Sequence, residues 1–322
     1  MHEPAVPNIT KDALLAAASN GSDRHMQFSR RDPVLRGLVQ RGFALLGGCL
    51  LAFGASAALA GVLGQSSPGQ IGFQEGVTPI AHEIHWFHDV ILTPVIIAIS
   101  LFVLGLLAYI VVKFNDKANP VPSTTTHHTG LEVAWTVIPV LILVAISIPS
   151  FRLLTHQLVE PKAEVTMKVT GKVWNWSYTY PKDQAGGFGF DSIMKPDADI
   201  KPAEGDVRQL SVDNEAVLPV DTVVRLEITS DDVIHSFVVQ AFGVRMDAVP
   251  GRLNTVWFKA EKEGMFYGQC SKLCGKDHAY MPIAVRIVSK EKYAAWLGEA
   301  KKKFASAAVE PVAVATLQPV QQ

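Results

Sequence analysis

Two long runs without a charged residue constrain this chain more than any other feature of its sequence. The first covers residues 90–112 and the second covers residues 133–151, with Glu132 and Arg152 on either side of the second run. A helix of the first length extends about 34 Å, enough to cross a hydrocarbon core of about 30 Å. Only 18% of the residues are charged, against about 25% in an average soluble domain. We therefore predict a two-helix transmembrane hairpin within residues 61–152, rather than two buried helices of a soluble protein.

The first 60 residues have the order of a secretory leader. Arg30, Arg31, Arg36 and Arg41 precede an uncharged apolar stretch, which ends at the small residues of the Ala58-Leu59-Ala60 segment. That order predicts a signal peptide, and its unusual length leaves an uncleaved anchor as the alternative. Basic loops stay in the cytoplasm, so everything after Arg152 is expected outside, in the periplasm of a bacterium. This topology predicts a multi-pass protein of the bacterial inner membrane.

Short β-rich segments dominate the chain from residue 153 to residue 290. They are AEVTMKVT, KVWNWSYTY, TVVRLEITS, HSFVV, NTVWFKA and PIAVRIVS, mostly alternating and separated by turn residues. No long helical pattern lies between them, so they predict an all-β sandwich or barrel rather than a βαβ fold. Residues 291–322 are expected to form a C-terminal helix and then a disordered tail.

Metal-binding residue types gather in the segment GQCSKLCGKDHAYMP. Cys270, Cys274, His278 and Met281 follow one another at short spacing, and His235 lies on an earlier predicted strand. Thiolates and a thioether are soft ligands, and imidazole suits copper. A disulfide, a structural zinc site and a pair of ordinary core residues remain the alternatives from spacing alone. Two thiolates can bridge two copper ions, with one histidine on each ion.

The chain resembles subunit II of haem–copper cytochrome c oxidases over residues 71–304. The resemblance rests on the two hydrophobic runs and on five motifs: EVAWT at 132–136, WNWSY at 174–178, DVIHS at 232–236, DAVPGR at 247–252 and GQCSKLCGKDHAYMP at 268–282. It implies that the outer domain is a cupredoxin-like Greek-key barrel with a dinuclear copper centre, CuA. It also implies that electrons pass from cytochrome c through this centre to haem in subunit I, where oxygen is reduced to water.

The same resemblance assigns a role to each metal-site residue. Cys270 and Cys274 would bridge two copper ions, while His235 and His278 would be the terminal imidazoles. Met281 would be the weak ligand of one ion, and the backbone carbonyl of Lys272 would bind the other. Most relatives have glutamate in place of Lys272, where its carboxylate joins a magnesium site. An ammonium group cannot bind a cation, so the presence of magnesium is doubtful in this chain.

Two further residues carry roles implied by the resemblance. Trp174 corresponds to the tryptophan that takes electrons from cytochrome c, although the alternation of Trp174, Trp176, Tyr178 and Tyr180 also fits simple core packing on a strand. We expect Trp176 to be a core residue. Glu132 corresponds to the entrance of a proton pathway into subunit I, and Thr129-x-x-Glu132 also has the form of a helix capping box.

Charge points to the expected partners. The net charge is −1, which gives no signal for nucleic acid. Residues 181–221 contain nine acids and four bases, a local net charge of −5 that suits a basic cytochrome c. The other expected partners are subunit I, further oxidase subunits and the lipid membrane. A membrane-anchored copper chaperone or thiol reductase using Cys270 and Cys274 is the rival function, and a quinol oxidase subunit of the same fold is a second rival.

Overall fold

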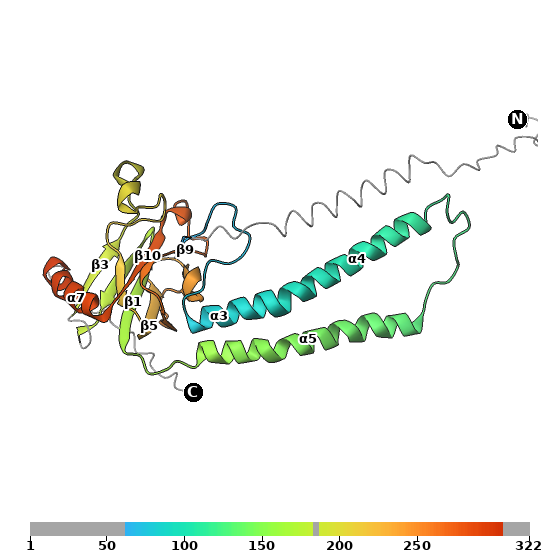
Figure 1. Ribbon diagram of the computed structural model, residues 1–322, viewed down its shortest axis with the longest axis horizontal. Helices are drawn as coiled ribbons and strands as arrows, with labels where there is room; N and C mark the ends of the chain where they lie inside the picture. The colour runs from blue at the N-terminus through green and yellow to red at the C-terminus, as the bar shows by residue number, and fades with distance from the viewer. Residues whose placement is uncertain (1–61, 183–186, 305–322) are drawn as a thin grey trace, which may run out of the picture. The chain divides into compact units, whose positions relative to one another are not determined.

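The computed structural model describes residues 62–182 and 187–304 (Figure 1). The predicted leader of residues 1–60 and the predicted tail from about residue 308 lie outside these described residues. The described ranges contain the membrane helices and the β-domain.

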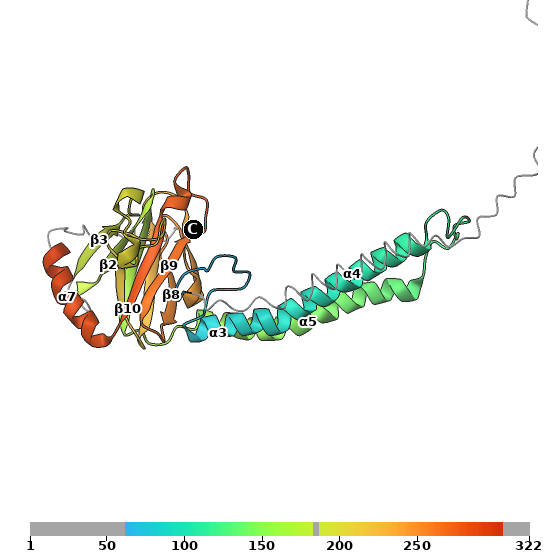
Figure 2. The same ribbon diagram turned by 45° about the horizontal axis from the view of Figure 1, so that its top comes forward.

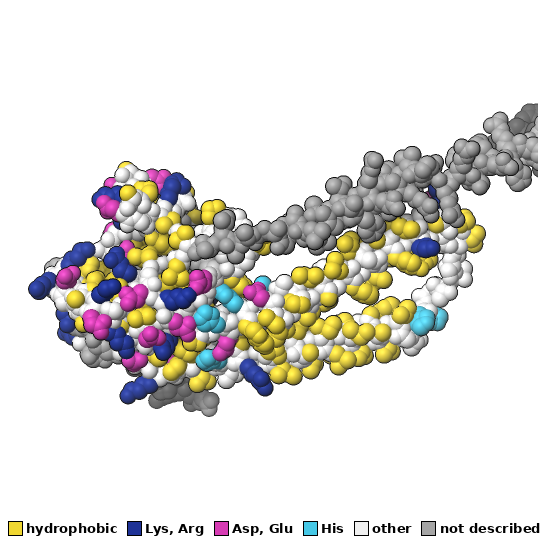
Figure 3. Space-filling view, in the orientation of Figure 1, with side chains coloured by type: hydrophobic (Ala, Val, Ile, Leu, Met, Phe, Trp, Pro, Cys, Tyr) yellow, Lys and Arg dark blue, Asp and Glu magenta, His cyan; other side chains and the backbone are white. Residues whose placement is uncertain are grey.

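Two long apolar helical segments cross the membrane, as predicted. The first is continuous from Pro79 to Lys113 and consists of α3 (Pro79–Trp86), the π-helical turn η1 (Phe87–Leu92) and α4 (Thr93–Lys113); the second is α5 (Thr129–Leu158). Hydrophobic side chains cover both segments, whereas charged side chains gather on the β-domain (Figure 3). Both helical segments are longer than the uncharged runs. Residues 79–89, 129–132 and 152–158, which include polar and charged side chains, continue the helices beyond these runs.

Local sequence explains how the first segment begins and why it contains a π-turn. Thr78 is the N-cap, and its hydroxyl accepts a hydrogen bond from the Ala81 backbone N–H. Pro94 has no N–H to continue the α-helical ladder. Just before it, the N–H of Thr93 bonds to the carbonyl of His88 five residues back, as in a π-turn.

Two five-stranded sheets form the β-domain. The first has the order β3-β2-β1-β5-β8 and the second has the order β4-β10-β9-β6-β7. Figure 2 shows the strands of this domain with the C-terminal helix beside β3. The strands are β1 (Val165–Lys172), β2 (Asn175–Tyr180), β3 (Phe188–Ser192), β4 (Ala216–Pro219), β5 (Val223–Ser230), β6 (His235–Val239), β7 (Val244–Ala248), β8 (Asn254–Lys259), β9 (Gly264–Cys270) and β10 (Pro282–Val288). The pairs β1–β5 and β4–β10 are parallel, and the other strand pairs are antiparallel. This architecture is the cupredoxin-like β-sandwich expected from the sequence.

The core fills the space between the sheets, and alternate residues of β2 and β5 are buried in it. Along β2, Trp176, Tyr178 and Tyr180 are fully buried, which confirms Trp176 as a core residue. The C-terminal helix α7 (Lys290–Phe304) packs its aromatic side chains on β3, where Phe304 stacks on Phe190 at 4.5 Å between ring centroids. Short 3-10 turns complete the loops: η2 (Asp197–Asp199), η3 (Pro202–Glu204), η4 (Gln240–Phe242) and η5 (His278–Tyr280).

The segment that precedes the first membrane helix also packs on the β-domain. The N–H of Val77 donates to the carbonyl of Ala241 at 2.9 Å, and the N–H of Glu261 donates to the carbonyl of Val77 at the same distance. The N–H of Tyr267 donates to the carbonyl of Gly64 at 2.8 Å. Val77 itself is fully buried in the main core cluster. Residues on both sides of the two membrane helices therefore build one domain.

Candidate metal centre

The ends of two neighbouring strands bring the first ligands together. His235 begins β6 and Cys270 ends β9, and these strands are paired with Phe237 opposite Cys270. Cys274 follows in the loop after β9, and His278 and Met281 lie in η5 and just before β10. The β6–β9 pairing thus joins a histidine and a cysteine that are 35 residues apart in the sequence.

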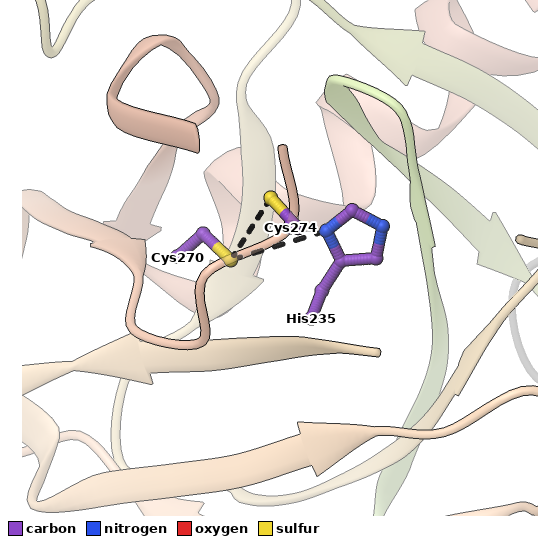
Figure 4. A group of neighbouring side chains, drawn as sticks. All are labelled: His235, Cys270 and Cys274. Atoms are coloured by element: carbon purple, nitrogen blue, oxygen red, sulfur yellow. Dashed lines mark hydrogen bonds between the residues drawn. The ribbon is translucent and has the colours of Figure 1, made fainter. Parts of the chain in front are cut away.

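Three side chains point toward one another at this end of the sandwich. Figure 4 shows His235, Cys270 and Cys274, whose ligand atoms lie within 4.8 Å of one another. The Sγ atom of Cys270 is 3.9 Å from His235 Nδ1 and 3.9 Å from Cys274 Sγ. All three residues are buried.

Three more groups complete the donor set. The Sγ atom of Cys274 lies 3.4 Å from His278 Nδ1 and 3.5 Å from Met281 Sδ, and Met281 is 1% exposed. The Sγ atom of Cys270 lies 3.3 Å from the carbonyl oxygen of Lys272. Every ligand expected from the sequence therefore contacts one of the two sulfur atoms.

The chemistry of these donors favours copper over the alternatives that spacing left open. A disulfide has its sulfur atoms about 2.05 Å apart, whereas Cys270 and Cys274 are free thiols at 3.9 Å. Two sulfur atoms, imidazole nitrogen and a thioether form a soft donor set, which suits copper and departs from the usual zinc ligands because of Met281. The group is thus able to hold a metal ion, and copper is the metal that it fits.

The two thiols differ in acidity because their surroundings differ. Burial raises the pKa of Cys270, but hydrogen bonds involving His235 and the backbone outweigh burial and lower it to about 7. Burial and then the charge of Cys270 raise the pKa of Cys274 to about 12. Burial lowers the pKa of His235, but its contacts with Cys270 and then Asp232 raise it above its ordinary value. One thiolate is therefore available near neutral pH, and the second requires a metal ion to displace its proton.

Trp174 and Trp176 each donate a hydrogen bond to a backbone carbonyl of the segment that carries the candidate ligands. The indole Nε1 of Trp174 donates to the carbonyl oxygen of Cys274 at 3.1 Å, and that of Trp176 donates to the carbonyl oxygen of Met281 at 3.2 Å. Trp174 is half-buried and packs at the edge of the core. Gly275 has a positive φ of 123° and leaves no room for a Cβ atom, which would lie 2.9 Å from the Trp174 ring. A glycine is thus needed where the ligand loop passes the tryptophan.

Glu132 lies apart from the metal centre, in the first turn of α5. Its carboxylate accepts a hydrogen bond from the backbone N–H of His128 at 3.2 Å. The N-cap is His128 rather than the expected Thr129, because the His128 Nδ1 atom accepts from the Leu131 N–H. The place of the Glu132 carboxylate at the helix N-terminus was correctly predicted, whereas the predicted capping box with Thr129 was wrong because His128 is the N-cap.

Asp232 and Gly171 surround His235, and sequence reasoning selected neither of them. The Asp232 Oδ1 atom lies 2.9 Å from His235 Nε2. A Cβ atom on Gly171 would lie 2.8 Å from His235 Cδ2, so only glycine leaves room for the ring. Spacing alone hints at Asp232, three residues before His235, but Gly171 is distant in the sequence and meets His235 where β1 of one sheet faces β6 of the other.

Comparisons with known proteins identify similar proteins of one family. The family described as cytochrome C oxidase subunit II, transmembrane domain, matches residues 66–153, and cytochrome C oxidase subunit II, periplasmic domain, matches residues 165–288. The chain is 47% identical over 239 residues to the probable cytochrome c oxidase subunit 2 of Rickettsia bellii (strain RML369-C), covering 74% of this chain and 87% of the relative. It is 46% identical over 253 residues to cytochrome c oxidase subunit 2 of Cereibacter sphaeroides, covering 74% and 83%. A solved periplasmic domain of subunit II of cytochrome oxidase from Bradyrhizobium japonicum is 57% identical, covers 45% of this chain and 99% of that chain, and has a TM-score of 0.42.

Proposed function

Because the chain belongs to the cytochrome c oxidase subunit II family, we propose that it takes electrons from cytochrome c at a dinuclear CuA centre and passes them to haem in subunit I. Membership makes it a membrane-bound subunit of an oxidoreductase in the bacterial inner membrane, with its β-domain in the periplasm and other oxidase subunits as partners. The donor, the dinuclear state and the electron route belong to the proposal. The convergence of two thiols, two imidazoles and a thioether on one end of the sandwich carries it.

Each donor has a role in this proposal. Cys270 and Cys274 would bridge the two metal ions, with His235 and His278 as the outer imidazoles. Met281 and the carbonyl oxygen of Lys272 would be weaker ligands. A pair of copper ions bound there would accept one electron at a time and share it between them. The chain supplies the rest: buried ligands on strand ends hold their positions, so little reorganisation accompanies a change of charge.

Trp174 is the proposed residue through which electrons arrive. Its indole is half-buried, with one edge bonded to the carbonyl oxygen of Cys274. That hydrogen bond gives a short covalent and hydrogen-bonded route from the indole to a bridging sulfur atom. Trp176 is fully buried and serves the core instead.

The rival functions are less well supported. A chaperone or thiol reductase needs only Cys270 and Cys274, and leaves unexplained why His235, His278 and Met281 gather on the same two sulfur atoms. Such proteins usually carry an α/β domain, whereas this chain has two β-sheets. Quinol oxidase relatives of this fold lack the copper ligands, all of which are present here.

Cytochrome c is the proposed donor, and the acid-rich segment bears on how it would be attracted. Six acids of this segment form ion pairs: Asp191 with Lys172, Asp197 with Arg208, Glu204 with Lys201, Asp206 with Lys195, Glu215 with Arg286 and Asp221 with Lys259. Three of these bases come from outside the segment, so the negative field is smaller than a local net charge of −5 implies. We therefore expect the KM for a basic cytochrome c to rise with salt, but only moderately.

The proposed proton role of Glu132 rests on the resemblance and on its position at the start of α5. The residue is partly exposed in the isolated chain, so its carboxylate is able to face a partner subunit. Glu132→Gln in the purified oxidase should slow turnover at saturating cytochrome c while leaving the copper signal intact. Equal turnover in the variant and the wild type would contradict this role.

A metal count tests the central proposal. The purified oxidase should contain two copper ions assigned to this subunit, with an EPR signal from one unpaired electron shared between them. His235→Ala should abolish that signal, whereas His127→Ala, which removes an exposed imidazole from the loop between the membrane helices, should leave it unchanged. One copper ion, or zinc alone, would contradict the dinuclear centre.

A further inference from the structure

Asp232 joins two parts of the candidate site that lie 59 residues or more apart in the sequence. Its Oδ1 atom is 2.9 Å from His235 Nε2, and its Oδ2 atom accepts a hydrogen bond from the backbone N–H of Val173 at 2.7 Å. Val173 directly precedes Trp174. One carboxylate therefore contacts both the proposed copper ligand and the turn that carries the proposed electron acceptor.

The contact decides which nitrogen of His235 faces the metal. An ionised carboxylate only accepts hydrogen bonds, so Nε2 must carry the proton that points to Asp232. The lone pair is then on Nδ1, which is the atom facing Cys270 Sγ at 3.9 Å. Ligand histidines commonly donate their second N–H to a carboxylate in this way, which fixes the tautomer and the ring orientation.

The surroundings leave the ring little other freedom. Gly171 lies against one side of His235 and has no room even for a methyl group. The Trp176 ring meets the imidazole edge-on, with 5.9 Å between centroids. Asp232 is itself held, because the N–H of Val233 donates to its Oδ1 atom at 2.6 Å. The His235 ring is thus held by the carboxylate of Asp232, the backbone of Gly171 and the indole of Trp176.

We propose that Asp232 is a positioning residue, which holds His235 with Nδ1 toward the metal and ties the Trp174 turn to the same ligand. This inference rests on the proposed function, since it concerns how the ligands of that centre are oriented. It assigns Asp232 an inward role, distinct from a surface charge that attracts cytochrome c.

Neighbouring acids allow a matched test in the purified oxidase. Asp232→Ala removes both contacts. Asp232→Asn keeps the shape but replaces one accepting oxygen with an NH₂ donor, so it cannot accept from both His235 and Val173, which now face different oxygens. Asp231→Asn removes the same charge from the exposed adjacent residue and is the control. The haem spectrum of each preparation reports whether the complex has assembled.

Three measurements separate orientation from attraction: the histidine nitrogen hyperfine coupling in the copper EPR signal, the rate of copper loss to a chelator, and kcat with KM for cytochrome c. We expect Asp232→Ala to shift the nitrogen coupling, to weaken copper retention by about 10- to 100-fold and to lower kcat, with a smaller effect for Asp232→Asn. Asp231→Asn should leave the coupling and copper retention unchanged.

Two results would overturn the inference. If both Asp232 variants matched Asp231→Asn in coupling and copper retention, or changed only KM, Asp232 would be a surface charge and nothing more. If the wild-type oxidase held no copper at this site, the proposed function would fail and the inference would fail with it. A normal wild-type copper signal distinguishes the first failure from the second.

Discussion

The indole Nε1 of Trp174 donates a hydrogen bond to the carbonyl oxygen of Cys274 at 3.1 Å. This contact links an aromatic ring at the edge of the core to the backbone of a residue whose sulfur atom faces the metal-binding group. The link depends on Gly275, because any side chain there would collide with the ring. The relationship gives the proposed electron route a defined chemical path.

Replacing Trp174 should separate electron transfer from copper binding. Trp174→Gln should lower the rate of cytochrome c oxidation at least about tenfold, equivalent to about 1.4 kcal/mol, while the copper signal stays intact. Trp174→Phe keeps a ring but loses the hydrogen bond and should lie between. Val173→Ala, a change at an exposed neighbour, is the control, and stopped-flow measurement of copper reduction is the assay. Normal reduction in Trp174→Gln would leave the residue a packing role only.

The sulfur ligands should differ in importance. Cys270→Ser or Cys274→Ser should abolish the shared-electron EPR signal, because a hydroxyl is a poor ligand for soft copper. Met281→Leu should keep copper and mainly change the reduction potential, since a weak axial ligand tunes the metal more than it holds it. Copper analysis and redox titration check both. Loss of copper from Met281→Leu alone, with a normal Cys variant, would reverse these assignments.

Lys272 should prevent the magnesium site that the family resemblance would otherwise imply here. Magnesium takes oxygen ligands, and an ammonium group adds repulsion where a carboxylate would bind. Oxidase from cells grown with manganese should therefore show little bound manganese by EPR, and Lys272→Glu should raise that occupancy without changing the copper content. Lys276→Glu provides a control carboxylate on the same loop. Full manganese occupancy in the wild type, unaffected by Lys272 substitution, would contradict this expectation.

Metal uptake by the copper-free chain should depend on pH through the two thiols. The pKa of Cys270 is lowered to about 7 and that of Cys274 is raised to about 12. Between about pH 8 and pH 10, Cys274 alone still holds a thiol proton, so binding should release about one proton and the apparent affinity should rise about tenfold per pH unit. Below pH 7 Cys270 is also protonated, and proton release should increase. Equal release at pH 6 and pH 9, measured in weak buffer, would contradict the difference between the thiols.

Gly171 should be intolerant of a methyl group. In Gly171→Ala the new Cβ atom would lie 2.8 Å from His235 Cδ2, so the ring or the strand must shift, at a cost of about 1–3 kcal/mol. We expect reduced copper content and a lower unfolding temperature. Gly298→Ala on α7 is the control, because nothing lies within 4 Å of its Cβ position. Equal copper content in both variants would show that the ring adapts.

Much of the fold could be predicted from sequence patterns. Six segments with β-branched or aromatic residues were predicted as strands and form β1, β2, β5, β6, β8 and β10. The other four strands were missed, since β4 is short and ends in Pro219, and β9 contains glycines and no β-branched residue. Four of the proposed metal ligands could be selected because they lie within one short segment, and their individual roles came from the family resemblance.

The supporting contacts could not be predicted for a different reason. Asp232, Val173 and Gly171 meet because β1 and β5 pair in parallel, with Gly171 opposite Ser230. That register is set by the whole sheet and leaves no local trace in the sequence. The ion pairs of Glu215 and Asp221 could not be predicted for the same reason, since their partners Arg286 and Lys259 lie on strands that follow the acid-rich segment.

The segment before the first membrane helix has a consequence for how the protein is made. Val77 is buried in the core of a domain whose strands are all synthesised after both membrane helices. Its backbone partners, Ala241 and Glu261, leave the ribosome more than 150 residues after it. The domain therefore reaches its final fold only once the hairpin is inserted and the later strands have been exported. A fragment that starts at residue 153 lacks Val77 and leaves the place of this side chain in the core unfilled. Residues 62–78, supplied as a separate peptide, would provide the missing side chain and its backbone hydrogen bonds.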